Sequence, residues 1–268
     1  MTIPISDPDD PRIEAYRAVR ERDLAGREHR FVAEGEVVLR MLLRQSRFMV
    51  ESVLLGENRV QGLSEALAAL PSETPVYVAG RAVMDAIVGF PIHRGVLAIA
   101  RRAPLRPVEE LLAALASESL VVGLVGLANH DNVGGIFRNA AAFGADAVLI
   151  DAETCDPLYR KAIRVSVGGV LVVPFTRVPS AAAMVQALRR ADFEVISLTP
   201  SGRETLSGLR RPPRAALLLG AEGPGLPVAV LDQTRTVSIP MRSGFDSLNV
   251  ATTSGIALHH LAALRAGT

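Results

Sequence analysis

A single cysteine and a single lysine are the most conspicuous shortages in this sequence. With only Cys155, the chain can form no internal disulfide framework and no cysteine-rich metal site, and it fits a reducing compartment. Of the 29 lysines and arginines, all but Lys161 are arginine. Arginine binds phosphate through paired hydrogen bonds and stacks on nucleobases, so this bias suits an RNA-binding protein. A genome whose codon usage favours arginine would give the same bias.

Long apolar runs and a strong net charge are also missing. The most apolar stretches, 120–127 and 216–219, break after a few residues, so no membrane span is predicted. The first residues carry acids and lack an apolar core, so we expect no signal peptide. A net charge of +1 at pH 7 creates no overall basic field. We therefore expect a cytoplasmic protein without a membrane partner.

The 268 residues suffice for one large domain or two ordinary ones. A stretch with two prolines and two arginines, residues 102–110, is the candidate linker. We predict a small N-terminal α/β domain over 1–104 and a second domain over 105–268. In the first, residues 1–10 are predicted to be a loose tail and 11–46 to be helical. Later short strands at 50–56, 75–80 and 94–101 are predicted to alternate with helices at 64–70 and 81–88.

The second half alternates strands and helices more clearly, which predicts a parallel sheet with helices on both faces. The predicted strands are 120–127, 146–151, 170–175, 193–199, 215–220 and 235–240. The predicted helices are 108–115, 134–144, 156–169, 181–191, a short one within 227–233, and a last one from about Leu248 to Arg265.

Three segments that mix glycine with polar residues follow predicted strands: 129–139, 220–225 and 242–249. Open α/β sheets bind ligands beyond the carboxyl ends of their strands, so these loops predict a binding site. A helix N-terminus there would suit a phosphate. Simpler explanations exist for single residues. Arg138 could pair with Asp146, Glu222 could be an acid near a helix start, and Ser247 could cap the last helix.

Other chemistries fail on the spacing of their residues. The sequence has neither the glycine spacing of a dinucleotide site nor a GK[ST] phosphate loop. His259 and His260 are adjacent on a predicted helix and cannot form a paired zinc site, so we expect no metal. A cysteine nucleophile at Cys155, with His130 and Asp131 as base, lacks an evident partner arrangement and is disfavoured.

The three polar segments resemble the three motifs of the SpoU (TrmH-like) family, the RNA ribose 2′-O-methyltransferases of the knotted SPOUT superfamily. "NVGGIFRNA" runs from Asn132 through Arg138, "LLLGAEGPG" ends the strand at 217–225, and "IPMRSGFDSLNV" covers 239–250. The resemblance extends from about Leu120 to the C-terminus. The stretches "FRNA" (137–140) and "ATTSG" (251–255) depart from the usual family pattern. More weakly, the first domain is similar to an RNA substrate-binding domain that resembles large-subunit ribosomal proteins.

The resemblance implies an α/β fold whose C-terminal chain forms a deep trefoil knot, and a homodimer through the C-terminal domain whose active site draws on both subunits. It also implies S-adenosylmethionine as cofactor, with no metal. Backbone groups of Gly220, Ile239 and Leu248 would hold it. The remaining cofactor-binding residues that the resemblance implies are Leu198, Thr199, Gly225 and Met241.

For catalysis, the resemblance implies Arg138, which would hold the phosphate next to the target ribose and stabilise the developing alkoxide. A guanidinium does not give up its proton easily, so the phosphate or solvent would accept the proton. Asn132, Ser247 and Asn249 would orient the ribose and the arginine, and Glu222 would fix the loop or the arginine. Ribosomal RNA is the favoured substrate and transfer RNA the next. The alternatives are a non-catalytic RNA-binding or assembly factor and a SPOUT enzyme that methylates a base; a nucleotide-binding enzyme is a more distant one.

Overall fold

The chain forms two compact units. In the computed structural model, residues 2–17, 29–88, 95–242, 244 and 247–263 are described. One unit combines Met1–Pro104 with Leu158–Val172, and the other combines Leu105–Pro157 with Val173–Thr268. The division after Pro104 falls at the predicted linker. Leu158–Val172 was predicted to belong with the second half, but its contacts join it to the first unit.

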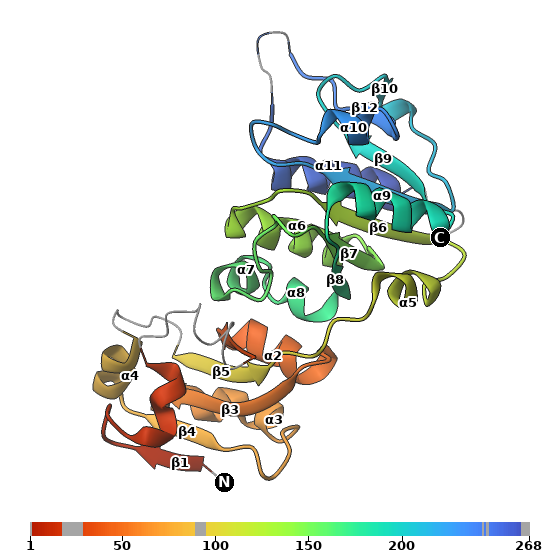
Figure 1. Cartoon of the computed structure of the whole chain (residues 1–268). Coiled ribbons are helices and arrows are strands. Elements are labelled where there is room, and N and C mark those ends of the chain that lie inside the picture. The colour runs from red at the N-terminus through yellow and green to blue at the C-terminus, as the bar shows by residue number, and fades with distance from the viewer. Residues whose placement is uncertain (1, 18–28, 89–94, 243, 245–246, 264–268) are drawn as a thin grey trace. The chain divides into compact units, whose positions relative to one another are not determined.

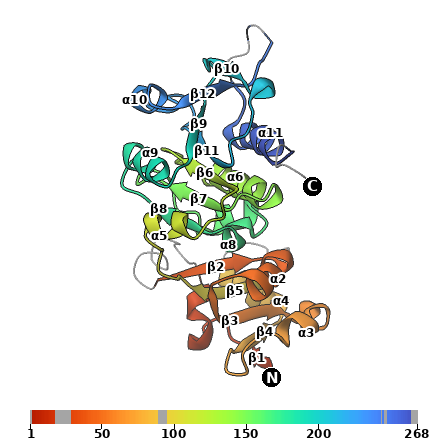
Figure 2. The ribbon, with the colours of Figure 1, turned by 90° about the vertical axis from the view of Figure 1, so that its right-hand side faces the viewer.

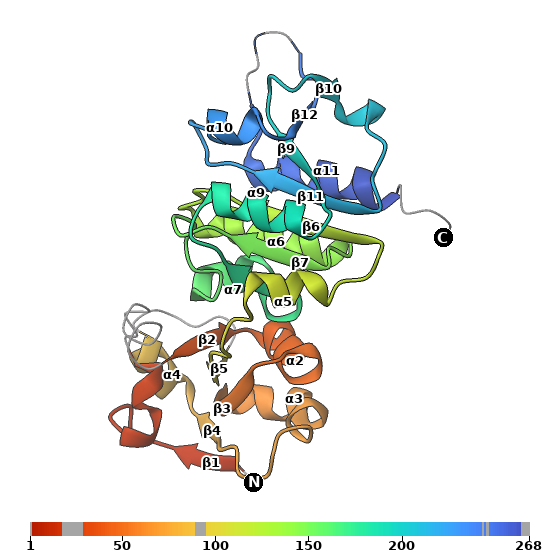
Figure 3. The ribbon, with the colours of Figure 1, turned by 45° about the vertical axis from the view of Figure 1, so that its right-hand side comes forward.

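The first unit is built on a five-stranded mixed sheet in the order β1-β4-β3-β5-β2 (Figure 1). Its strands are β1 (Thr2–Ile5), β2 (Arg30–Glu34), β3 (Met49–Gly56), β4 (Val76–Ala79) and β5 (Val96–Arg101). Its helices are η1 (Pro11–Tyr16), α2 (Glu36–Gln45), η2 (Glu57–Arg59), α3 (Val60–Leu67), α4 (Arg81–Val88), α7 (Arg160–Val165) and α8 (Gly169–Val172). In Figure 3, η1 and α4 lie on one side of the sheet and α2 and α3 on the other.

Two predictions in this unit were wrong because tertiary pairing outweighed the local pattern. The predicted loose tail contains β1, which pairs in parallel with β4 and buries Ile5. The predicted helix over 11–46 is interrupted by β2, whose residues from Phe31 to Glu34 are all buried. Such a run is apolar on both faces and does not show the alternation of a half-exposed strand. Gly35, at φ 100°, then allows the turn from β2 into α2.

The segment from α7 to α8 packs on the first unit, with α7 against β2 and α8 against α2. Glu34 is 7% exposed, and its Oε2 lies 3.9 Å from both Arg160 and Arg164 of α7. A strand was predicted at 170–175, but residues up to Val172 form the helical turn α8 instead. The chain turns at Gly168, which has φ 85°. The side chains of Val170 and Leu171 are buried after this turn, although their backbone joins no sheet.

The second unit contains a seven-stranded sheet in the order β10-β12-β9-β11-β6-β7-β8, and every pairing is parallel. The predicted α/β fold with a parallel sheet is therefore confirmed. The strands are β6 (Ser119–Leu124), β7 (Ala147–Ile150), β8 (Phe175–Arg177), β9 (Glu194–Leu198), β10 (Glu204–Thr205), β11 (Arg214–Leu219) and β12 (Arg235–Ser238). The helical segments are α5 (Val108–Ala113), α6 (His130–Ala142), α9 (Ala181–Arg190), η3 (Leu206–Gly208), α10 (Val228–Leu231) and α11 (Val250–Ala263).

Helices cover both faces of this sheet. Figure 2 shows the sheet between α5, α9 and α10 on one face and α6 and α11 on the other. Leu112, Met184 and Val230 bring α5, α9 and α10 into one buried apolar cluster with the strands. Burial on both faces explains why β6 and β11 are continuous apolar runs. No described helix is long and apolar enough to cross a membrane.

Two glycines let backbone segments of the second unit approach closely. A Cβ on Gly202 would lie 2.3 Å from the carbonyl carbon of Val237, and one on Gly220 would lie 2.4 Å from that of Gly225. Neither neighbour is a flexible side chain end, so the backbone itself would have to move. These positions therefore require glycine for lack of space.

We expect Gly202→Ala to destabilise the protein by at least about 2 kcal/mol, because the added methyl group overpacks a backbone contact. Gly62→Ala is the matched control, since a Cβ there meets nothing within 4 Å. Gly62 lies in the exposed part of α3, where alanine stabilises a helix by up to about 1 kcal/mol relative to glycine. Urea denaturation of both variants measures the difference. Equal stability of the two would contradict the argument.

Candidate functional site

A cavity of about 470 Å³ opens at the carboxyl ends of β9, β11 and β12, beside the start of α11. It brings together most of the residues predicted for the site. Those that line it are Leu198, Thr199, Gly220, Gly225, Ile239, Met241 and Leu248 of the predicted cofactor residues, and Glu222, Ser247 and Asn249 of the predicted catalytic ones. Six further lining residues were not predicted from the sequence: Pro200, Leu219, Ala221, Gly223, Val250 and Thr253.

The missed residues carry a signal that could have found them. All but one are direct neighbours in the chain of predicted residues, as Pro200 is of Thr199. Thr253 lies one helical turn after Asn249, and its Oγ1 donates a hydrogen bond to the Asn249 carbonyl oxygen at 2.9 Å. Helical spacing from Asn249 would therefore have pointed to Thr253.

Asn249 is the centre of a polar cluster at the edge of the cavity. Its Nδ2 donates to Oδ1 of Asn132 at 2.8 Å and to Oε1 of Glu222 at 3.2 Å. Asn132 is buried on α6, with 4% of its surface exposed, although it does not line the cavity. The cluster thus joins one residue from each of the three polar segments of the sequence.

Asn249 also caps α11, a role that was considered for Ser247 as an alternative to a catalytic one. Its Oδ1 accepts hydrogen bonds from the backbone N–H groups of Ala251 at 2.9 Å and Thr252 at 3.2 Å. Ser247 is not the cap because α11 begins at Val250, which puts Asn249 at the capping position. Capping uses the amide oxygen and leaves the amide nitrogen for the cluster. Asp246 and the predicted helix end at Arg265 lie outside the described residues.

Arg138 is the one predicted catalytic residue that lies neither in this cluster nor along the cavity. It is exposed on α6, does not line the cavity, and forms no ion pair or hydrogen bond through its side chain with the described part of the chain. Asn132 and Arg138 are six residues apart, about 1.7 helical turns, so they point in different directions. The considered pairing with Asp146 is absent too; that carboxylate accepts from the N–H of Leu120 at 2.7 Å.

The start of α6 is fixed by the loop that precedes it. Asn129 caps the helix by accepting from the N–H of Asp131 at 2.9 Å. Further back, the buried carboxylate of Asp151 accepts from the N–H of Gly126 at 3.1 Å. Gly126 has φ 68°, a conformation that favours glycine. These contacts hold the loop from β6 and therefore the position of Asn132.

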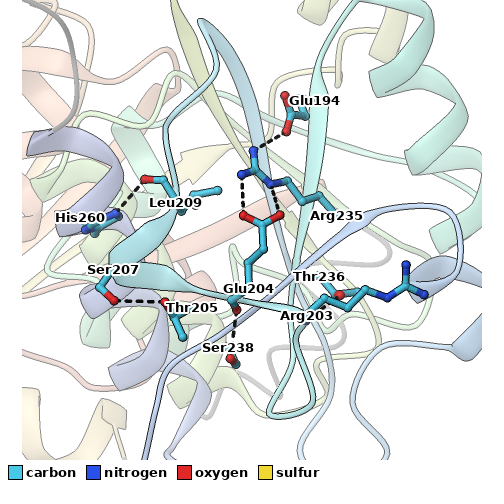
Figure 4. Close-up of polar contacts among 10 residues, drawn as sticks. All are labelled: Glu194, Arg203, Glu204, Thr205, Ser207, Leu209, Arg235, Thr236, Ser238 and His260. Atoms are coloured by element: carbon cyan, nitrogen blue, oxygen red, sulfur yellow. Dashed lines mark hydrogen bonds and ion pairs between the residues drawn. The ribbon is translucent and has the colours of Figure 1, made fainter.

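One wall of the cavity, 198–200, leads into a segment that we call the strap, residues 201–209. Figure 4 shows how the strap is held on β12 and α11. Arg235 of β12 donates two hydrogen bonds to the Glu204 carboxylate, at 2.7 and 2.6 Å, and a third to Glu194 at 2.8 Å. At the other end, a ring nitrogen of His260 lies 3.3 Å from the Leu209 carbonyl oxygen. The strap is therefore attached to β12 through Glu204 and to α11 through Leu209.

Cys155 is unsuited to act as a nucleophile. Burial of the thiol, with a smaller contribution from Asp156, raises its pKa to about 11. At neutral pH the reactive thiolate is therefore scarce. This agrees with the rejection of cysteine chemistry from the sequence.

A partly apolar cavity with a cluster of amide and carboxylate groups, at the carboxyl edge of a parallel sheet, is the arrangement of an α/β enzyme that binds a polar organic ligand. Comparison with known proteins defines the class more narrowly. The sequence profile of the SpoU rRNA Methylase family matches residues 119–259. The chain belongs to this family, a class of RNA methyltransferases, and the resemblance inferred from the three motifs is confirmed.

Individual relatives agree with this assignment. An uncharacterized tRNA/rRNA methyltransferase of Mycobacterium bovis is 38% identical over 95% of this chain and 90% of its own length. The 23S rRNA (guanosine-2′-O-)-methyltransferase RlmB of Salmonella typhi is 29% identical over 81% of this chain and 91% of its own. The AdoMet-bound rRNA methyltransferase from Sinorhizobium meliloti shares the fold, with a TM-score of 0.82, 21% identity and 99% of both chains covered.

The ion pair between Glu204 and Arg235, which we call the clasp, should make the free energy of unfolding depend on pH. The hydrogen bonds from Arg235 hold the pKa of Glu204 below its ordinary 4.5. A carboxyl group whose pKa is lowered by folding stabilises the folded state above its unfolded pKa and loses this effect as pH falls through the folded value. We therefore expect Glu204→Gln to lower the melting temperature at pH 7, and the difference from the unmodified protein to shrink below pH 4.5.

Melting curves over this pH range, recorded by circular dichroism, measure the effect. Glu118→Gln is the control, because Glu118 is exposed and forms no ion pair with the described residues. A difference for Glu204→Gln that stays constant with pH would show that the clasp is not electrostatic.

Proposed function

We propose that this protein transfers a methyl group from S-adenosylmethionine to the 2′-hydroxyl of a ribose in structured RNA. Ribosomal RNA is the favoured substrate, and transfer RNA is the next. The observation that carries the proposal is the cluster of Asn132, Glu222 and Asn249 beside the cavity, which unites the three family motifs. The ribosomal preference is supported by the similarity to RlmB, which is named for 2′-O-methylation of 23S rRNA. A cytoplasmic location follows from this substrate.

The residues around the cavity fit the cofactor. The volume of about 470 Å³ lies within the range of small-molecule sites, about 300–1,000 Å³. Leu198, Leu219 and Ile239 offer an apolar surface for a flat base, and the carboxylate of Glu222 suits a cationic group. Gly220 lines the cavity and has no room for a Cβ, because the backbone of Gly225 lies against it. When bound, the cofactor would supply a methyl group on a positively charged sulfur.

The chain's own residues have to align the ribose and stabilise the charge that develops on its oxygen. Asn249 is held by its cap interaction and by Asn132, and its amide nitrogen would reach the ribose by exchanging the longer of its two bonds, the one of 3.2 Å to Glu222. Ser247 also lines the cavity and offers a hydroxyl group. The guanidinium of Arg138 would hold the phosphate beside the target and stabilise the alkoxide. The proton of the 2′-hydroxyl would leave to that phosphate or to solvent.

Arg138 can fulfil this role if the protein is a homodimer. On α6 it is exposed and turned away from Asn132, so it does not reach the cavity of its own chain. A second copy that packs on this face of α6 would bring its own Arg138 to the cavity. We also propose that the C-terminal chain is knotted. The close contact of Gly202 with Val237 and the clasp of the strap are consistent with such a threading.

The first test is methyl transfer from labelled S-adenosylmethionine into RNA of a strain that lacks the gene. Ribosomal and transfer RNA are kept apart, and the labelled product is treated with alkali. We expect label in ribosomal RNA at a linkage that resists alkaline cleavage, because a 2′-O-methyl group blocks attack by the hydroxyl. Label at an alkali-sensitive linkage would indicate base methylation. Cofactor binding without label in either fraction would indicate a non-catalytic RNA-binding factor.

A complementation experiment tests the shared active site. Arg138→Ala and Asn249→Ala should each abolish transfer as homodimers. If the two variants are unfolded and refolded together, half of the dimers contain one chain of each variant. In such a dimer, one of the two sites would have both residues intact. If Arg138 of one chain serves the cavity of the other, one of the two sites works in half of the dimers. We therefore expect about a quarter of the unmodified activity. The control is each variant refolded alone. No recovery in the mixture would place Arg138 and Asn249 in the same chain's site.

A further inference from the structure

One stripe of α6 carries three residues that contact α11. Asn132, Gly135 and Asn139 follow at intervals of three and four residues and therefore lie on the same face of the helix. Asn132 bonds to Asn249, as described above. A Cβ on Gly135 would lie 2.7 Å from the Cβ of Ala251, so the two helices are in close contact there.

The end of the stripe remote from the cavity is held by Asn139. Its Nδ2 donates to the carbonyl oxygen of Ala251 at 2.7 Å and to Oγ of Ser254 at 2.9 Å. Ser254 is fully buried, and its hydroxyl also donates to the Ala251 carbonyl oxygen at 2.7 Å. A Cβ on Gly255 would lie 3.2 Å from the same Nδ2, so a larger residue there would press on the asparagine.

These contacts fix both the position and the rotation of α6. Two polar attachments, at Asn132 and Asn139, lie on either side of the tight contact at Gly135. If the outer attachment is removed, the helix can tilt about that contact. Asn139 is also the neighbour of Arg138, which is about 100° further round the helix. Because Asn139 points to α11, Arg138 is turned to the solvent side.

We propose that Asn139 and Ser254 are positioning residues for methyl transfer, and this rests on the function proposed above. They touch neither the cavity nor the reacting groups. They act through α6, by setting where Asn132 meets Asn249 and in which direction Arg138 is presented to a second copy. Both residues also lie in the two stretches, 137–140 and 251–255, that depart from the usual family pattern.

The test is Asn139→Ala in the full chain, with turnover expressed per cofactor-binding site from calorimetry with S-adenosylmethionine. We expect turnover to fall about 10- to 100-fold, since a displacement of about 1 Å in a reacting geometry has an effect of this size. The Kd for S-adenosylmethionine and the KM for RNA should stay within about twofold, because ground-state contacts are kept. Ser254→Ala removes only one of the two bonds of Asn139 and should give a smaller fall in turnover.

Thr176→Val is the matched control for a purely structural effect. Thr176 is 2% exposed, and its Oγ1 donates to the Arg106 carbonyl oxygen at 2.5 Å in the same unit, far along the sheet on β8. It should lower the melting temperature comparably and leave turnover per site unchanged.

The outcomes separate the two proposals. If the unmodified protein transfers no methyl group to RNA, the proposed function fails. If it does, and Asn139→Ala keeps normal turnover per site or loses no more than Thr176→Val, the positioning role is overturned. Should Asn139→Ala not fold, Ser254→Ala decides in the same way, because it leaves the bond to Ala251 in place.

Discussion

The packing of α11 against α6 is the contact on which the candidate site depends. It brings Asn249 to Asn132, although 117 residues separate them in the chain. Small residues allow the close approach, since a Cβ on Gly135 would collide with Ala251. Polar side chains then fix the helices relative to each other, which apolar packing alone does less specifically. The bond between the side-chain amides of Asn132 and Asn249 forms only when the two helices are held in one relative orientation, and hydrogen bonds between the helices provide that orientation.

The cavity depends on a second kind of close approach, between backbone segments. Gly220 and Gly202 leave no space for a side chain where β11 meets the loop at Gly225 and where the strap meets β12. The clasp between Arg235 and Glu204 attaches the strap to β12. The walls of the cavity are thus held by close backbone contacts and by the ion pair between Arg235 and Glu204. This arrangement leaves polar groups such as Thr199 and Glu222 on the cavity side.

The first unit shows where local patterns mislead. Its sheet takes in β1 and β2, two segments that were predicted as tail and helix. A short edge strand such as Thr2–Ile5 is stabilised by its partner β4, which nothing in its own sequence indicates. The turn α8 was predicted as a strand, because a short apolar run suits either structure until its packing partner, α2, is known.

The parallel α/β fold, the family and ten of the sixteen residues that line the cavity were predictable from the sequence alone, because strand–helix alternation and motif spacing are local features. That Asn249 caps α11 while it bonds to Asn132 and Glu222 became visible only in the folded chain. The folded chain also shows that Arg138 faces away from the cavity and that Leu158–Val172 joins the first unit. Such results depend on which distant segments pack together, and the orientation of a side chain on a helix is fixed by those contacts.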